Sequence, residues 1–146
     1  MAASSSLLLS IGAAYRGSLE IIRKSAVLKD KHSTLAVSIL QYVDRNSGVA
    51  QGELGRILRR DPMTMSQAIR AMQEAGWLVS KADAEDRRVK RLAVTAKGKK
   101  VSKAIRSSEE KLARHLAKAW GKSRYERFLK DLNDYDGVLN AISGNG

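Results

Sequence analysis

The chain has 146 residues, with 27 lysines and arginines against 15 aspartates and glutamates, which gives a formal net charge of +12. A chain of this length can bury one modest core, and such a positive surplus indicates a polyanionic partner, with nucleic acid ahead of an anionic membrane surface. The absence of cysteine from the sequence excludes disulfides, thiolate catalysis, cysteine redox sensing and cysteine-ligated zinc.

Two helices are predicted in the first third of the sequence. Apolar residues, beginning with Leu8 and Ile11, recur at helical spacing between residues 6 and 28. Their short apolar start has no basic residue before it, and no apolar run in the chain reaches the length that spans a bilayer, so we expect a cytoplasmic, unprocessed protein. Ser33 is predicted to cap the second helix, which the turn at residues 46–48 ends.

The next segment is predicted to form two short helices joined by a tight turn. The first runs from Ala50 to Arg59. Asp61-Pro62 marks the start of the second, because an aspartate accepts hydrogen bonds from the free amides of a first turn and proline suits the first helical position. Gly76 ends this helix. Its apolar stripe, which we expect in the core, consists of Met65, Ile69 and Met72.

A basic hairpin and two further helices complete the predicted order. Residues 77–80 and 89–95 are predicted to be strands joined by a polar turn. A long amphipathic helix from Lys97 to Trp120 is followed by Gly121, and Ser123 is predicted to cap a last helix whose apolar residues face inward. The expected fold class is therefore mainly α with a small β-hairpin wing: a winged helix-turn-helix with N- and C-terminal helices.

This order predicts how the chain would contact DNA. The second helix of a helix-turn-helix enters the major groove, and its N-terminal residues face the base edges. The residues placed there are Met63, Thr64, Ser66, Gln67 and Arg70. Gln67 suits an adenine edge and Arg70 a guanine edge or a phosphate, while Arg59 and Arg60 lie in the turn where phosphates would pass. Residues 50–100 support this interpretation, because they hold 12 basic residues against 6 acidic ones.

Several residues at ordered spacing carry a resemblance to a known family. They are Leu54, Leu58, Ser66, Gly76, Asp86, Arg88, Val94-Thr95 and Lys97-Gly98. Together they resemble the DNA-binding core of the multiple antibiotic resistance regulator (MarR) family. That family has a leucine-rich third helix, a recognition helix with a central serine and a closing glycine, an Asp-x-Arg wing, and a strand that ends in apolar-Thr before Lys-Gly. The match covers residues 50–100, and the flanking helices agree in number and place.

The resemblance implies one MarR-like domain over residues 1–146 that acts as a homodimer. Residues 33–98 would form the DNA-binding lobe, and residues 1–30 and 99–146 would form the helical dimerisation region. Such proteins bind pseudo-palindromic operators, and many repress genes until a small phenolic or anionic effector releases them from DNA.

The resemblance also implies roles for the wing. Arg88 would enter the minor groove at the wing tip, and Asp86 would hold it in place. Their neighbours at the phosphates would be Arg87, Lys90 and Arg91. Lys81 stands where the family commonly has an arginine, which keeps the charge and loses the planar fork.

Other features bear on the turn, on effectors and on metals. Arg59 and Arg60 depart from the family's pattern, which usually has a small and an apolar residue in the turn. An effector pocket is expected between the long helices and the DNA-binding lobe. The candidates for it are Tyr15, Arg16, His32 and Tyr42, although the tyrosines suit core packing better. We expect no cofactor. We also expect no metal, because the only two histidines, His32 and His115, are far apart in sequence.

The sequence bears on four candidate functions, of which it favours one. The leading one is a sequence-specific, double-stranded DNA-binding transcriptional regulator, a homodimeric repressor released by a small-molecule effector. The alternative is a nonspecific, architectural DNA-binding winged-helix protein, whose affinity would fall steeply with salt for any sequence. A winged-helix module for protein partners fits the positive middle third poorly. No enzyme is expected, because the sequence lacks a phosphate loop, a dinucleotide glycine pattern and a nucleophile–base pair.

Overall fold

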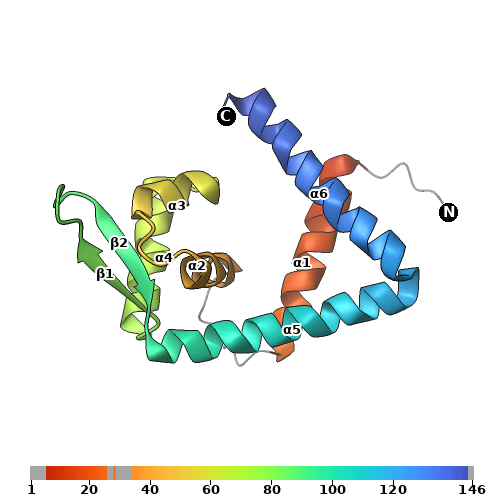
Figure 1. Ribbon diagram of the computed structural model, residues 1–146, viewed down its shortest axis with the longest axis horizontal. Coiled ribbons are helices and arrows are strands. Elements are labelled where there is room, and N and C mark those ends of the chain that lie inside the picture. The colour runs from red at the N-terminus through yellow and green to blue at the C-terminus, as the bar shows by residue number, and fades with distance from the viewer. Residues whose placement is uncertain (1–5, 26–27, 29–33, 145–146) are drawn as a thin grey trace. The chain divides into compact units, whose positions relative to one another are not determined.

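The computed structural model describes residues 6–25, 28 and 34–144, and this part of the chain forms six helices and two strands (Figure 1). The elements are α1 (Leu7–Ser25), α2 (Thr34–Arg45), α3 (Gln51–Ile57), α4 (Pro62–Glu74), β1 (Leu78–Ala82), β2 (Lys90–Val94), α5 (Ala96–Trp120) and α6 (Lys122–Ser143). The expected fold class, mainly α with a β-hairpin, is thereby confirmed. Ser33 lies outside the described residues, and none of the described helices is long and apolar enough to cross a membrane.

The chain divides into two compact units, residues 1–108 and 109–146. The boundary falls inside α5, about halfway along the helix, so α5 contributes to both units. The sequence-based division at residue 98, with the helices on either side as a dimerisation region, stays a prediction.

The core of the first unit is built around α2. Helix α2 lies against β2 and α4, and α4 also packs on α3 and β1. The apolar side chains with less than 2% exposure are Ile39, Leu40, Val43, Leu54, Met65, Met72, Leu78, Leu92 and Ile105. Met65 and Met72 in this set, with nearly buried Ile69, confirm the apolar stripe predicted for the fourth helix.

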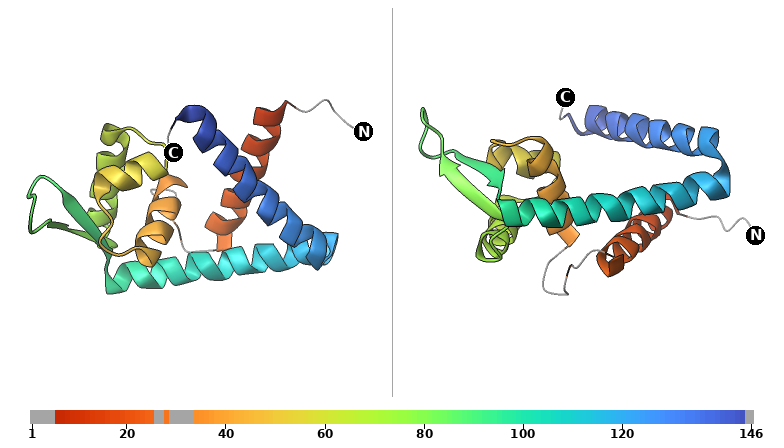
Figure 2. Two further views of the ribbon diagram at one scale, coloured as in Figure 1. Left: turned by 45° about the horizontal axis from the view of Figure 1, so that its top comes forward. Right: turned by 60° about the horizontal axis from the view of Figure 1, so that its bottom comes forward.

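The hairpin is joined to the rest of the unit by a third extended segment. Strands β1 and β2 pair antiparallel, from Leu78 opposite Val94 to Ala82 opposite Lys90. On the other edge of β2, Ala50 bridges Arg91, and the Leu92 backbone bonds to Gly48 and Val49 at 2.8 and 3.0 Å. The hairpin therefore extends from a small sheet that includes the segment before α3, and its outer end projects away from α3 and α4 (Figures 1 and 2).

Helix α5 begins directly after β2 at a closely packed corner. The Thr95 hydroxyl accepts a hydrogen bond from the Gly98 amide at 2.9 Å and donates one to the Gly76 carbonyl at 2.5 Å. A side chain at Gly98 has no room, because a Cβ there would lie 2.2 Å from the Trp77 carbonyl oxygen. The Thr-x-Lys-Gly motif that resembles the MarR family thus has a packing role at this corner.

A polar contact also joins α2 to the first half of α5. One carboxylate oxygen of Asp44 accepts hydrogen bonds from the Ser102 hydroxyl at 2.7 Å and from the Arg106 guanidinium at 2.8 Å. Ser102 is buried and the Asp44 carboxylate is largely covered. Such a shielded, charge-assisted contact fixes α5 relative to the core of the first unit.

The first helix is buried over a short stretch. Leu19 and Ile22 join the core, while Leu8 is 77% exposed and Ile11 and Tyr15 are also exposed. The amphipathic stripe predicted for this helix therefore continues beyond what the core of the first unit covers.

The second unit contains the end of α5 and all of α6. Trp120 and Phe128 pack edge to face with ring centroids 5.3 Å apart, and the Arg124 guanidinium lies 5.3 Å from the Trp120 ring centroid. The prediction that Ser123 caps α6 is wrong: Gly121, with a φ of 85°, occupies the cap position and α6 begins at Lys122. The prediction of an inward apolar face is also wrong for the single chain, because no residue of α6 is buried within the described structure.

Candidate nucleic-acid interface

Helix α4 begins at a strong N-terminal cap. The two carboxylate oxygens of Asp61 accept hydrogen bonds from the Thr64 amide at 2.9 Å and the Thr64 hydroxyl at 2.6 Å. These two donors, the hydroxyl first, lower the pKa of Asp61 below its usual value. Pro62 occupies the first turn, as predicted. The start of α4 is therefore fixed, and with it the direction in which the first-turn side chains leave the helix.

One face of α4 is exposed along its first two turns. It carries Met63, Ser66, Gln67 and Arg70, which are all exposed. Thr64 is half-buried, and its hydroxyl is directed to Asp61. The side-chain amide of Gln51 donates a hydrogen bond to the Ser66 hydroxyl at 3.2 Å, so the exposed face of α4 also contacts the start of α3.

The turn between α3 and α4 is stable although it contains two arginines. Arg59 has a φ of 53°, the left-handed conformation that usually calls for glycine. The Arg59 amide donates to the Arg56 carbonyl at 3.2 Å and the Arg60 amide to the Gly55 carbonyl at 2.9 Å. This pair of bonds is a Schellman motif, which satisfies the last carbonyls of α3. The departure from the family's pattern is thus accommodated by a left-handed arginine.

At the outer end of the wing, Arg88 is paired with Asp86. The Arg88 guanidinium donates twice to the Asp86 carboxylate, from Nε at 3.1 Å and from Nη2 at 3.2 Å, and its amide donates to the same carboxylate at 3.0 Å. The side chain of Arg88 is nevertheless 92% exposed. An ion pair this exposed adds little to stability, so its main consequence is that Arg88 is oriented before it meets any ligand.

A second aspartate organises the inner part of the wing. The Asp83 carboxylate accepts hydrogen bonds from the amides of Glu85 at 2.8 Å and Asp86 at 3.3 Å. It also pairs with the Arg91 guanidinium at 2.7 Å, and Arg91 in turn donates to the Gly48 carbonyl at 3.3 Å. Arg91 thus links the wing to the segment before α3.

These contacts determine the charge state of the wing acids. The amide of Glu85, followed by the guanidinium of Arg91, lowers the pKa of Asp83. The guanidinium and amide of Arg88 lower the pKa of Asp86. Both carboxylates are therefore ionised at neutral pH, and each orients one arginine.

The wing and the helix-turn-helix share a hollow on the surface of the first unit. A pocket of about 550 Å³ lies between the start of α3, the start of α4 and the wing. Its wall includes Arg56, Arg60, Arg88 and Lys90, with Glu53 as the one acid among its lining residues. The structure thus brings predicted residues of the turn and of the wing to one strongly basic region.

The remaining predicted residues lie on the same unit. Lys81 on β1, and Arg87 and Lys90 at the wing, are exposed. Sequence reasoning assigned Arg91 to phosphates and gave Asp83 no role, whereas the structure pairs the two residues. The signal was present in the sequence, because an aspartate at the first position of a turn commonly accepts from amides two and three residues later. Contact of any of these residues with DNA stays a prediction.

The comparisons with known proteins agree with this architecture. Residues 33–98 match the family model described as "winged helix DNA-binding domain". No curated protein sequence matches the chain. Among solved structures, the crystal structure of MarR superposes with a TM-score of 0.84 at 22% identity, covering 100% of this chain and 99% of that one.

Two further structures show the same fold. A MarR transcriptional regulator from Methanosarcina mazei Go1 superposes with a TM-score of 0.81 at 22% identity, covering 91% of this chain and 95% of that one. FabT from Streptococcus pneumoniae, in complex with DNA, superposes with a TM-score of 0.76 at 16% identity, covering 92% and 94%.

The fold and the matched domain define a winged-helix protein. Residues 33–98 match the model of the winged helix DNA-binding domain. The chain as a whole has the fold seen in the MarR structures, which confirms the fold that the resemblance over residues 50–100 implied.

Proposed function

We propose that this protein is a sequence-specific, double-stranded DNA-binding transcription regulator of MarR type that acts in the cytoplasm as a homodimeric repressor and has no catalytic activity. The observation that carries the proposal is the wing. Asp86 pairs with Arg88 and favours one orientation of its guanidinium, while the Arg88 side chain stays almost fully exposed, in the same unit as the exposed face of α4. A cation oriented in this way is suited to a narrow, negative groove.

In this proposal α4 and the wing share the contact with DNA. Helix α4 enters the major groove with Gln67 and Arg70 at the base edges, and Arg88 enters an adjacent minor groove. Arg60 and Lys90, which line the basic hollow between turn and wing, neutralise phosphates. Arg91 has mainly a structural part, because it is paired with Asp83.

A competition assay between duplexes tests the proposal. The preferred duplex is first selected from a random pool with the wild-type protein, and its affinity is then compared with that of a scrambled duplex. Arg88→Ala is expected to weaken binding to every duplex. Gln67→Ala and Arg70→Ala are each expected to weaken binding to the selected duplex by a factor on the order of 10 or more, and also to change which sequence is preferred. Lys118→Ala, an exposed lysine in the second unit, is the control for loss of one positive charge.

The same assay distinguishes the architectural alternative. A nonspecific binder would show the same steep salt dependence on both duplexes and would select no motif. If the three interface variants bind the selected duplex like the wild type, α4 and the wing are not the reading surface and the proposal fails.

The terminal helices support the homodimer. Leu8 on α1 is 77% exposed and Ile142 on α6 is 78% exposed, and α1 and α6 each expose several further large apolar side chains. Large apolar side chains left exposed in such numbers favour an interface with another chain. Sedimentation equilibrium is expected to give twice the mass of one chain for the wild type and for the control Lys130→Glu, and a lower mass for Leu132→Glu. A monomeric wild type would contradict the homodimer.

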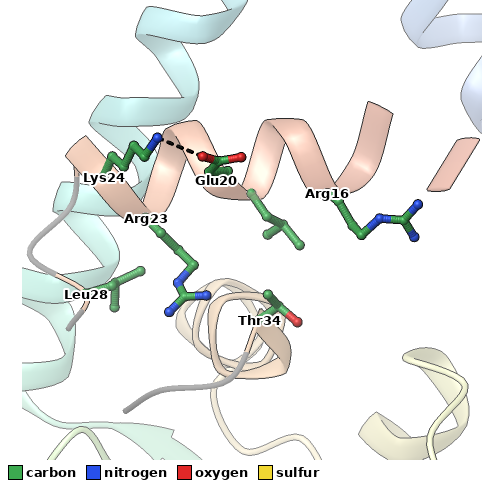
Figure 3. A pocket seen from close by; sticks show the side chains of 7 residues that line it. Arg16, Glu20, Arg23, Lys24, Leu28 and Thr34 are labelled. Atoms are coloured by element: carbon green, nitrogen blue, oxygen red, sulfur yellow. Dashed lines mark hydrogen bonds and ion pairs between the residues drawn. The ribbon is translucent and has the colours of Figure 1, made fainter. Parts of the chain in front are cut away.

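A second pocket supports regulation by a small molecule. It lies in the first unit between α1 and the start of α2, has a volume of about 540 Å³, and is lined in part by Arg16, Arg23 and Thr34 (Figure 3). Arg23 extends from α1 toward the start of α2, and Lys24 is paired with Glu20 at 2.7 Å. Arginines beside an apolar floor of Leu19 and Leu28 suit an anion with an apolar body.

The earlier effector candidates divide between this pocket and other places. Arg16 lines the pocket, Tyr42 packs against the core, Tyr15 is exposed, and His32 lies outside the described residues. A panel of aromatic carboxylates is expected to include a compound that releases the wild-type protein from its selected duplex. Arg16→Ala should bind the duplex normally and require more of that compound for release; an unchanged requirement would place the effector elsewhere.

A further inference from the structure

The exposed face of α4 contains one side chain that neither charge nor hydrogen bonding explains. Met63 is 72% exposed, which makes it the most exposed large apolar residue between residues 34 and 98. The other methionines of α4, Met65 and Met72, are 1% exposed. The exposure is imposed by the Asp61 cap, which fixes the register of the first turn and places Met63 on the side opposite the core.

The polar groups beside Met63 are partly engaged within the protein. The Thr64 hydroxyl donates to Asp61 at 2.6 Å, so it has no proton left for a base. The Ser66 hydroxyl accepts from Gln51 at 3.2 Å. One and two turns further on, Gln67 and Arg70 lie on the same face as Met63, at helical spacings of four and seven residues.

We propose that Met63 recognises the 5-methyl group of a thymine in the major groove. This inference rests on the proposed function and adds a specificity determinant to it. Thymine is the only base that presents a methyl group in the major groove, and apolar side chains contact it there. The surrounding charge favours DNA over a protein partner, because Arg60 and Arg88 line the neighbouring hollow and residues 50–100 hold 12 basic against 6 acidic residues.

The position of Met63 along α4 limits where the thymine lies. A separation of four residues corresponds to a rise of about 6 Å along a helix, and stacked bases are about 3.4 Å apart. The thymine is therefore expected within about two base pairs of the base that Gln67 contacts, in each half-site of the operator.

The test replaces single thymines of the selected duplex by deoxyuridine, which removes the methyl group and keeps the base pair. For the wild type, a replacement in one half-site is expected to weaken binding about fourfold, the factor that burial of one methyl group supplies, and the same replacement in both half-sites about 15-fold. Met63→Ala is expected to bind the thymine duplex with a similar loss and to be insensitive to the same replacement. Met63→Leu, which keeps an apolar side chain, should retain the sensitivity, and replacements at other thymines should affect all three proteins equally.

The outcomes separate this inference from the proposed function. If the wild type selects no duplex, both fail. If it selects a duplex but deoxyuridine affects Met63→Ala and the wild type equally at every position, the inference alone is overturned. Thermal unfolding of each variant is expected to match the wild type, because the altered side chain lies outside the core.

Discussion

The corner between Trp77 and α5 allows a prediction about stability that comes from one interatomic distance. A Cβ at residue 98 would lie 2.2 Å from the Trp77 carbonyl oxygen and 2.7 Å from a methyl group of Val94. Favourable contacts between carbon atoms begin near 3.5 Å, so Gly98→Ala requires a backbone shift on the order of 1 Å. That shift strains two contacts, because the Trp77 carbonyl accepts from the Thr95 amide at 2.9 Å and the Thr95 hydroxyl caps α5.

The expected cost follows from these contacts. Overpacking of a buried position costs about 1–3 kcal/mol, and loss of a helix cap adds about 1 kcal/mol. Alanine recovers up to about 1 kcal/mol of helix propensity relative to glycine. We therefore expect Gly98→Ala to lower the free energy of unfolding by about 1–3 kcal/mol, which corresponds to a melting temperature lower by about 4–12 °C for a chain of this size.

A matched substitution provides the control. Gly52, in α3, has no heavy atom within 4 Å of the position a Cβ would take. Gly52→Ala is therefore expected to leave stability unchanged or to raise it by up to about 1 kcal/mol. Both variants are compared with the wild type by urea unfolding followed by circular dichroism at fixed protein concentration. If Gly98→Ala unfolds within about 0.5 kcal/mol of the wild type, a spread that ordinary surface substitutions show, the close approach of α5 to Trp77 is wrong.

Further predictions concern the turn, the caps and the acids. Asp61→Ala should lower the free energy of unfolding by about 1 kcal/mol in urea unfolding, because α4 loses its cap, while Asp61→Asn should retain most of it. Asp44→Ala should cost about 1–3 kcal/mol in the same assay, because buried Ser102 loses its acceptor; a neutral result would contradict the link between α2 and α5. Arg59→Gly should preserve the fold, since glycine accepts a φ of 53°, and weaken DNA binding only if the arginine side chain contacts phosphate. The Glu85 amide and the Arg91 guanidinium lower the folded-state pKa of Asp83 below its ordinary value of 3.8. The contribution of the Asp83 carboxylate to stability is therefore present above pH 3.8 and is lost as the pH falls through the folded-state pKa. An NMR titration that gives a pKa of 3.8 or higher for Asp83 would contradict this.

The helix-turn-helix was the most predictable part of the structure from sequence. Asp61 and Pro62 mark a helix start by local chemistry. The apolar residues from Met65 onward recur at helical spacing, which places them on one face of the helix. The Asp86–Arg88 pair came from the family resemblance, and the geometry of the wing bears it out. Signals of this kind act over a few residues, so a sequence contains them in full.

Contacts between distant parts of the chain were not predictable in the same way. The bond of Arg91 to Gly48 and the bridge at Ala50 depend on how the hairpin lies against the segment before α3. The left-handed backbone of Arg59 could not be inferred from the residue type, because arginine rarely adopts it. The exposed apolar residues of α6 fit an interface with a second chain. The spacing of apolar residues along a helix shows that one face is apolar, but it does not show whether the same chain or a partner covers that face.

The central claim is that α4 and the wing read a DNA sequence in a symmetric dimer. The most direct measurement is a selection of duplexes from a random pool by the wild-type protein at physiological salt, followed by sequencing. We predict an inverted repeat whose half-site centres lie about 10 base pairs, or a multiple of one helical turn, apart, and a changed half-site when the selection is repeated with Gln67→Ala. A pool that stays random, or a motif unaltered by Gln67→Ala and Arg70→Ala together, would contradict the claim.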